Sequence, residues 1–316
     1  MPIDPLSSVK IAAPCRGRRV GRALARTLLS AVVLGAVAHG CGMLGSAIPA
    51  ARADAPPDAP EYPLAVASLA DGSLVVADRV MPGLWRIADG HVAVQSLGSK
   101  KFRTPLNAVR TVAVAPDGTV WAGDPATRDL HRVAPDGTPT ALTGGKIGIP
   151  IDIAIDSKGT LFVSDLETQR VWRIPAGSAE PVELAVLSAP RGLYVDGADR
   201  LWVVAASGEA PLVRVTADGV VEPVVNSRAF QFPHDVVVTA DGTAYVSDNY
   251  AVAVWKVSAD GTVTKWASGA PLAGPVGLSL RDGKVLVADP KARMVFEIDA
   301  SGTAVPLFKS PVTAGG

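Results

Sequence analysis

The 316-residue chain is 48% hydrophobic and 19% charged, which fits one large globular domain and excludes a disordered or fibrous protein. The formal net charge is zero, but seven basic residues and one acidic residue lie within residues 1–53. This leaves 23 of the 30 basic and 29 of the 30 acidic residues for the rest, which therefore carries about six negative charges. Such an acidic domain argues against nucleic acid as a partner, because that binding depends on basic patches.

Residues 1–53 are predicted to be an export signal that is not part of the folded domain. A basic stretch from Arg16 to Arg22 precedes an apolar run from Thr27 to Ala38, and a small-x-small cleavage pattern ends at Ala53. We therefore expect a secreted, periplasmic or cell-envelope protein. Its contact with a membrane is expected only through this N-terminal segment.

Two other fates of the N-terminal segment stay open. Cys41 follows a sequence that resembles a lipoprotein acylation site, so the protein is also considered as a lipoprotein. The stretch from Thr27 to Ala51 has no charge and is long enough to span a bilayer as an uncleaved anchor. Cleavage after Ala53 would remove both cysteines, Cys15 and Cys41, and leave a mature chain without disulfides or thiolate ligands.

A Pro-rich linker over residues 54–61 leads into six copies of one repeat, which fill residues 62–310 and leave 311–316 as a tail. Each copy begins with an apolar segment, and the openings are spaced 46, 41, 40, 43 and 42 residues apart: Pro63, Val109, Pro150, Pro190, Pro233 and Pro275. A second short apolar segment follows in each copy and ends at Asp78, Asp124, Asp165, Ala205, Asp248 and Asp289. Third segments read LWRI, LHRV, VWRI, LVRV, VWKV and VFEI.

Four short strands in a period of about 41 residues are typical of a propeller blade. The sequence therefore predicts an all-β fold, a six-bladed β-propeller of four-stranded antiparallel blades, which is expected to be a monomer. The recurring Pro, Asp-Gly turn and strand ending in Ala-Asp or Ser-Asp resemble the NHL-repeat family over nearly the whole mature chain. That resemblance implies the propeller fold but no single activity, because propellers host enzymes, binders and scaffolds.

Residues that interrupt the repeat give the candidate site. First strands begin, and second strands end, at the same face of a propeller near its channel. There, Arg110, Arg191 and His234 replace apolar residues of other copies, which predicts a pocket for an anionic ligand. The candidate ligand-binding residues are Arg110, Arg191, His234, Asp235, Asp152, Glu167, Asn249 and Tyr250. The alternative is that the arginines simply pair with Asp152, Asp235 or Glu167.

Residues that recur in every blade are interpreted as structural. The Asp that ends the second strand is expected to accept hydrogen bonds from nearby backbone in each copy, rather than to bind metal. The recurring Trp85, Trp172 and Trp255 are expected to pack between blades.

A divalent cation, calcium or zinc, is considered only weakly, with Glu61 and His234 as candidate ligands. His234 follows an opening Pro, a position at which the similar peptide-amidating lyases hold zinc in several blades, and this chain has it once. Glu61 lies two residues before the first-blade Pro, as the metal ligand of gluconolactonase-like propellers does, but the other ligands of that family are missing. Asp235 is one place late, so strand alternation would turn it to the opposite face. The His and Glu arrangement of streptogramin-type lyases is not found either.

Two functions therefore remain open. One is an extracytoplasmic binding module that recognises a small ligand, glycan, peptide or protein through the channel mouth or the loop rim. The other is a metal-dependent hydrolase or lyase, like the gluconolactonases or the amidating lyases, with its site at the central channel.

Overall fold

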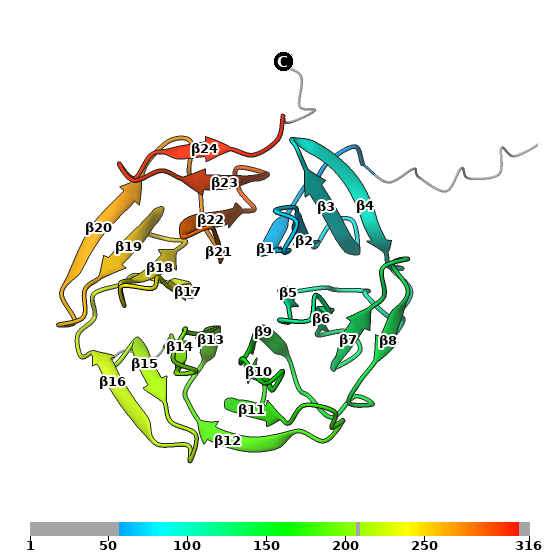
Figure 1. The fold of residues 1–316 in the computed structure, drawn as a ribbon, viewed down its shortest axis with the longest axis horizontal. Helices are drawn as coiled ribbons and strands as arrows, with labels where there is room; N and C mark the ends of the chain where they lie inside the picture. Colours follow the sequence, from blue (N-terminus) through cyan, green and yellow to red (C-terminus); the bar gives the residue numbers. More distant parts are fainter. Residues whose placement is uncertain (1–56, 207–208, 310–316) are drawn as a thin grey trace, which may run out of the picture. The chain divides into compact units, whose positions relative to one another are not determined.

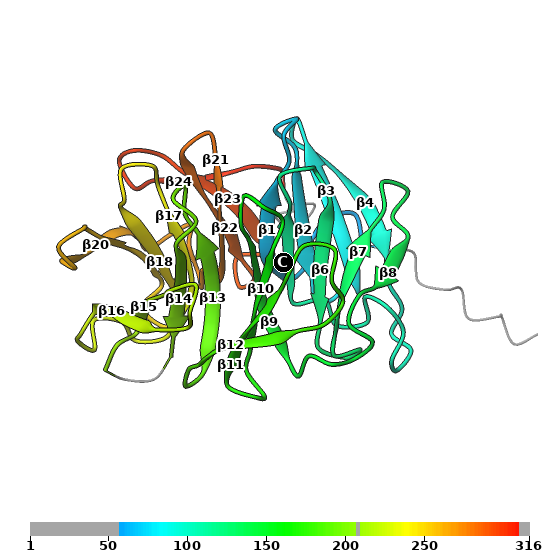
Figure 2. The same cartoon turned by 60° about the horizontal axis from the view of Figure 1, so that its bottom comes forward.

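The computed structural model describes residues 57–206 and 209–309, which form six four-stranded antiparallel sheets arranged as blades around a central channel (Figures 1 and 2). No helix in this described part is long and apolar enough to cross a bilayer. The predicted six-bladed propeller is confirmed. Every blade is built from one continuous stretch of chain, with its strands in sequence order.

In blades one to three the strands are ordered from the channel outward, first strand innermost. They are β1 Pro63–Ser68, β2 Leu74–Asp78, β3 Gly83–Ala88 and β4 His91–Leu97; β5 Thr111–Val114, β6 Val120–Asp124, β7 Asp129–Val133 and β8 Pro139–Ala141; β9 Pro150–Ile155, β10 Leu161–Asp165, β11 Arg170–Ile174 and β12 Val182–Val186.

Blades four to six follow the same plan. They comprise β13 Pro190–Val195, β14 Leu201–Ala205, β15 Leu212–Val215 and β16 Val221–Val225; β17 Pro233–Val238, β18 Ala244–Asp248, β19 Ala253–Val257 and β20 Val263–Ser268; β21 Gly277–Arg281, β22 Lys284–Asp289, β23 Met294–Ile298 and β24 Ala304–Pro306. All six second strands end at the predicted residue. The first strands of blades two and six begin two residues later than predicted, at Thr111 and Gly277.

A buried aspartate at the end of the second strand organises the loops in five blades. Asp165, which is 0% exposed, accepts bonds from the backbone N–H groups of Gly148 at 2.8 Å and Ile149 at 2.9 Å, which precede its blade. It also accepts from the N–H of Glu167 at 3.0 Å, in the loop that follows β10. Equivalent bonds from both loops reach Asp78, Asp124, Asp248 and Asp289. The structural interpretation of these aspartates is confirmed.

The recurring tryptophans connect this aspartate to the packing between blades. The indole Nε1 of Trp172 donates to Asp165 at 2.9 Å, and Trp85 and Trp255 donate in the same way to Asp78 and Asp248. Their rings lie in apolar clusters that include side chains of the preceding blade, such as Leu130 beside Trp172. The predicted packing between blades is confirmed, and the hydrogen bond gives a polar partner to the buried indole of Trp85 and to the partly buried indoles of Trp172 and Trp255.

Ring closure depends on packing between blades six and one. One core cluster joins Leu74 and Val76 of blade one with Leu286 and Phe296 of blade six. The backbones meet so closely here that a Cβ atom on Gly277 would lie 2.5 Å from the carbonyl oxygen of Leu64. Only glycine permits this approach, because it lacks the Cβ.

Replacing Asp165 with Ala should lower the free energy of unfolding by about 3 kcal/mol, because several buried donors lose their acceptor together. Urea denaturation of the purified protein measures this loss. Asp136→Ala is the matched control: Asp136 accepts one bond, from the Thr138 N–H, in an exposed turn, so its loss should be much smaller. Equal losses for the two variants would contradict the structural role assigned to Asp165.

Candidate functional site at the channel mouth

The channel mouth is the end of the channel at which first strands begin and second strands end. Four first strands, β1, β9, β13 and β17, have an irregular register directly after their opening Pro. Such bulges re-aim side chains at sheet rims. In β17 the irregularity spans His234 and Asp235, and both residues line the mouth. The expectation that alternation turns Asp235 to the opposite face was therefore wrong, because the bulge interrupts the alternation.

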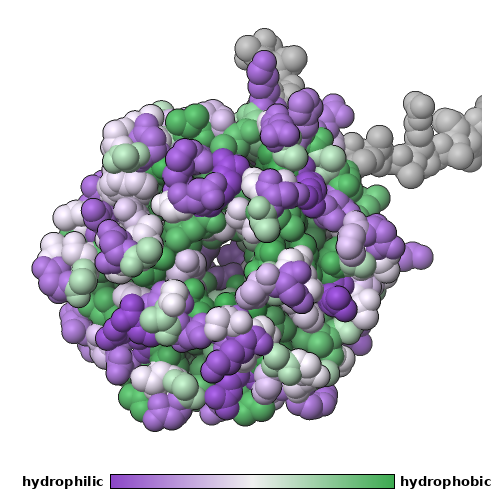
Figure 3. Space-filling model, in the orientation of Figure 1, coloured by the Kyte–Doolittle hydropathy of each residue, from purple (hydrophilic) through white to green (hydrophobic). Residues whose placement is uncertain are grey.

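The mouth narrows to a ring contributed by all six blades. Figure 3 shows the channel as an opening at the centre of one face of the molecule. Four of the predicted site residues line this ring among small and apolar side chains. The lining residues are Leu64, Ala65, Arg110, Ile151, Asp152, Gly192, His234, Asp235, Val276 and Gly277. The structure thus brings Arg110, Asp152, His234 and Asp235 together, from blades two, three and five.

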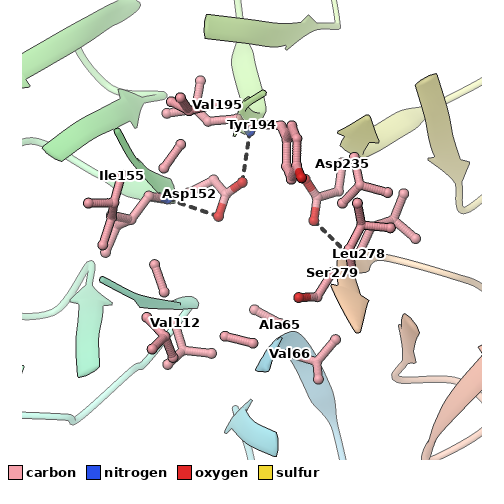
Figure 4. A pocket seen from close by; sticks show the side chains of 18 of the residues that line it. Ala65, Val66, Val112, Asp152, Ile155, Tyr194, Val195, Asp235, Leu278 and Ser279 are labelled. Atoms are coloured by element: carbon pink, nitrogen blue, oxygen red, sulfur yellow. Dashed lines mark hydrogen bonds between the residues drawn. The ribbon is translucent and has the colours of Figure 1, made fainter. Parts of the chain in front are cut away.

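Below the ring the channel widens into a cavity of about 250 Å³, into which Asp152 and Asp235 point from two sides (Figure 4). Asp152 accepts bonds from the Thr111 hydroxyl at 2.6 Å and the Leu193 N–H at 2.8 Å, and so connects blades two, three and four. Asp235 accepts from the Leu278 N–H of blade six at 2.6 Å. Both carboxyl groups therefore tie first strands of neighbouring blades together.

Burial shifts the protonation of these two carboxyl groups. Burial raises the pKa of Asp152, although the Thr111 hydroxyl and the Leu193 N–H oppose the change. For Asp235 burial and then repulsion from the Asp152 carboxylate raise the pKa well above its ordinary value. The two groups interact, so the pair holds a proton more tightly than two isolated aspartates would.

Gly192 occupies the place that Asp152 and Asp235 occupy in their own blades. A Cβ atom on Gly192 would lie 2.3 Å from the Asp235 Cα, so any side chain would collide with the backbone of blade five. Blade four therefore contributes no third carboxyl group to the channel.

Arg110 and Arg191 carry positive charge without an acidic partner. Neither guanidinium forms an ion pair within 4 Å in the described part of the chain, and the buried Nε of Arg191 has no hydrogen-bond partner there. Burial lowers the pKa of both arginines, with Asp152 opposing the change for Arg110. Arginine stays protonated even so. The alternative in which these arginines pair with Asp152, Asp235 or Glu167 is thus not what the structure has.

His234 is neutral because of its surroundings. Burial first, and then the positive charges of Arg191 and Arg110, lower the pKa of its imidazole to about 3. At neutral pH the ring therefore offers one N–H donor and one acceptor nitrogen.

An aromatic group flanks these polar residues. Phe232, directly before the opening Pro of blade five, lies under the Arg191 guanidinium, 4.4 Å from Cζ to the ring centroid. Tyr250 stacks on Phe232 at 4.6 Å, and His234 meets it edge-on at 5.0 Å. Tyr250 is 65% exposed. The mouth therefore combines cations, a neutral imidazole and an apolar wall.

The remaining predicted residues lie outside the ring. Glu167 pairs with Arg128 at 2.6 Å, and the amide of the buried Asn249 donates to the Gly274 carbonyl at 3.0 Å. The Glu61 carboxylate lies 3.3 Å from Arg293. Across residues 57–206 and 209–309, no group of three His, Cys, Asp or Glu side chains is placed to hold a metal ion. With two guanidiniums nearby and both channel carboxyls accepting N–H bonds, these residues do not fit a resident divalent cation.

Sequence reasoning missed Phe232. Arg79, which the repeat places directly after the second strand of blade one on the channel face, lowers the pKa of Arg110 by its charge. Sequence reasoning also missed that two sequence features occur together in the same two blades, three and five. The hydroxyls of Ser164 and Ser247 accept bonds from the Asp152 and Asp235 N–H groups at 3.0 and 3.1 Å. The second strands of these two blades end in Ser-Asp, and their first strands carry an Asp two places after Pro. This pairing was available as a signal in the printed sequence.

The raised pKa of Asp235 predicts a pH-dependent stability. A carboxyl group with a higher pKa when folded contributes stability at low pH, and this contribution is lost as pH rises through the folded pKa. Between pH 5 and pH 8 the free energy of unfolding of Asp235→Asn should therefore fall less than that of the unaltered protein. Asp241→Asn is the control, because hydrogen bonds from Thr239 and Thr243 lower the pKa of Asp241 and confine its effect to more acid solution. Parallel pH profiles for Asp235→Asn and the unaltered chain would refute the assignment.

Known proteins resemble this chain in sequence and in fold. A virginiamycin B lyase from Nocardia farcinica is 34% identical over 192 residues, which cover 61% of this chain and 66% of that protein. The crystal structure of virginiamycin B lyase from Staphylococcus aureus is 16% identical with a TM-score of 0.61, over 78% of this chain and 83% of that one. A gluconolactonase from Xanthomonas campestris gives a TM-score of 0.62 at 18% identity, over 74% and 85% of the two chains. At 16% and 18% identity, the likeness to these two solved structures concerns the fold alone.

The sequence likeness extends over most of the propeller. The family model described as the virginiamycin B lyase family matches residues 96–313, from the end of blade one through blade six. This match covers more than half of the chain, and it includes Arg110, Arg191 and His234 of the mouth. The chain belongs to the virginiamycin B lyase family of β-propellers.

Proposed function

We propose that this propeller binds a small organic anion at its channel mouth, outside the cytoplasm. The export part of the proposal is supported by the basic and apolar pattern of residues 1–53, which lie outside the described residues. The binding part is supported by the geometry of the mouth. A carboxylate or phosphate group is the ligand chemistry that two unpaired guanidiniums favour.

The observation that carries the binding proposal is that the Arg191 guanidinium lacks a hydrogen-bonding acceptor at its Nε within the described part of the chain. Its Nε is buried and has no hydrogen-bond partner among the described residues, which is costly for a charged donor. A buried arginine normally pairs with a carboxylate, yet the channel carboxyls are bonded to backbone and have a raised pKa. An anionic ligand would supply the missing acceptor.

The wall beside the cations favours an organic anion over an inorganic one. Phe232 and the exposed Tyr250 offer apolar surface next to Arg191. Most small-molecule sites combine apolar lining with a few converging polar groups in this way. His234, being neutral, adds a donor and an acceptor without competing for the negative charge.

A lyase is the second candidate, favoured by the family match and by His234. The His234 imidazole is unprotonated at pH 7 and has an acceptor nitrogen, although a pKa of about 3 makes it a weak base. The nearby guanidiniums of Arg110 and Arg191 would stabilise the negative charge that develops when a proton leaves carbon. The S. aureus relative has also been crystallised as a catalytically inactive histidine-to-alanine variant with quinupristin. The chemistry proposed here for this chain uses only its own side chains, because the mouth does not fit a metal.

Removing either free cation should weaken anion binding. Arg191→Gln and Arg110→Gln are each expected to raise the Kd for citrate at least about tenfold, because each deletes a charge-assisted contact in a partly buried site. Isothermal titration calorimetry measures the change. Arg128→Gln is the matched control, because Arg128 pairs with Glu167 and lies outside the ring. Unchanged citrate affinity in both mouth variants would place the site elsewhere.

The same variants provide a readout that does not need a ligand. Arg191 lowers the pKa of His234 by its charge, so Arg191→Gln should raise that pKa, measurable by NMR titration of the imidazole. A shifted pKa without a change in citrate binding would leave the electrostatic description intact and contradict only the function.

A lyase activity predicts that the protein consumes virginiamycin B. His234→Gln should then reduce the rate about a hundredfold or more, since general bases typically contribute that much. Mass spectrometry and chromatography follow loss of the parent compound. His91→Gln, an exposed histidine at the start of β4, is the control. No consumption by the unaltered protein would exclude this substrate, and consumption that survives in His234→Gln would remove the histidine from the reaction.

A further inference from the structure

The connection between blades one and two departs from the other inter-blade connections. It runs over 13 residues, from Gly98 to Arg110, whereas the connections that lead to blades three to six have three to eight residues. This is the reason for the long first repeat interval of 46 residues. The segment contains four cations, Lys100, Lys101, Arg103 and Arg110, and no acidic residue, although the domain as a whole is acidic.

Internal bonds hold this connection in one conformation. The side-chain amide of Asn107 donates to the carbonyls of Ser99 at 2.6 Å and Lys101 at 2.9 Å, and the Thr104 hydroxyl donates to the Lys101 carbonyl at 2.7 Å. Leu106 is fully buried in the core between blades one and two. The segment is therefore a loop braced by its own hydrogen bonds on both sides of its tip, Phe102 and Arg103.

The tip displays an aromatic ring among cations. Phe102 is 82% exposed, the highest value among the exposed large hydrophobic residues of the described chain, and the Arg103 guanidinium lies 5.3 Å from its ring centroid. Lys100 and Lys101 are exposed on its other side in sequence.

More apolar surface lies beside the foot of this loop. Leu97, 60% exposed, ends β4 opposite Gly83, and the Gly98 N–H bonds to the Pro82 carbonyl. The loop that holds Pro82 also contains Val80, 40% exposed, and Arg79. The tip, Leu97 and Val80 all lie on the mouth side of blade one, and these cationic and apolar residues are together called the rim.

We propose that this rim contacts an anionic lipid surface, with Phe102 entering the interfacial layer and Lys100, Lys101 and Arg103 lying at the headgroups. Aromatic rings favour the membrane interface, and clustered cations are attracted to anionic headgroups. The tip is exposed, and residues 99–103 line neither the ring at the mouth nor the cavity in the channel. A lipid surface requires no matching pocket, whereas a folded protein partner requires shape complementarity.

The rim adjoins the channel mouth, but the proposed lipid contact does not depend on which ligand the mouth binds. The braced loop ends at Arg110, so lipid contact would hold the channel mouth on the side that faces the membrane. The uncharged sequence from Thr27 to Ala51 is long enough to keep the chain at a bilayer, if it is retained.

Hydrogen exchange of the full chain with vesicles tests the proposal at the level of the loop. Peptides covering residues 98–106 should be protected by vesicles of phosphatidylglycerol and phosphatidylcholine, and not by phosphatidylcholine alone. Charge reversal in Lys100→Glu/Lys101→Glu should remove this protection, because each cation near an anionic surface contributes a factor of about five in affinity. Phe102→Ser should weaken it as well. Because all variants keep the N-terminal segment, the difference reports on the loop.

Two control variants lie at the other end of the blades. Lys158→Glu, in the turn between β9 and β10, and Val220→Ser, in the turn between β15 and β16, should keep the protection of residues 98–106. Protection that survives the loop substitutions, or none with anionic vesicles, would overturn the proposal. Protection by soluble polyglutamate but not by vesicles would also overturn it, and would point to an acidic protein instead.

Discussion

The buried aspartate at the end of the second strand is the interaction on which the mouth of this propeller depends. It accepts backbone N–H groups from the loop that enters its blade and from the loop that leaves the second strand. These loops carry residues of the mouth, such as Phe232, whose own N–H bonds to Asp248 at 2.9 Å. One buried carboxylate in each of these five blades therefore fixes the loops by satisfying donors that would otherwise be unpaired.

Blade four departs from this scheme. Its second strand ends in Ala205, and the nearest comparable bond runs from the Trp202 indole to Asp196, at the opposite end of the blade. The mouth-side loop of this blade thus has no carboxylate at its base, and residues 207 and 208 within it lie outside the described part of the chain. Arg191 and Gly192 belong to the same blade, so the irregular blade also contributes one of the two cations of the mouth that lack an acidic partner among the described residues.

The charge of the mouth follows from how the acidic residues are used. Aspartates at strand ends and in the channel accept backbone N–H groups, and several surface glutamates pair with neighbouring basic residues. Arg110 and Arg191 are left without such partners in the described residues, so an acidic domain has a positive channel mouth. Both the proposed ligand and the proposed lipid contact rest on this uneven distribution, since unpaired cations attract anions whatever the net charge of the domain.

The sequence by itself determined the architecture, because each blade repeats one pattern of short apolar strands and turn residues whose spacing is local. It placed the second-strand aspartates at the correct residue and identified Arg110, Arg191 and His234 as departures from the repeat. Only the tertiary structure decided how these departures meet. Three features of the mouth depend on contacts within and between blades: the bulge at His234 and Asp235, the close approach that excludes a side chain at Gly192, and the stacking of Arg191 on Phe232. Strand periodicity carries no information about such contacts.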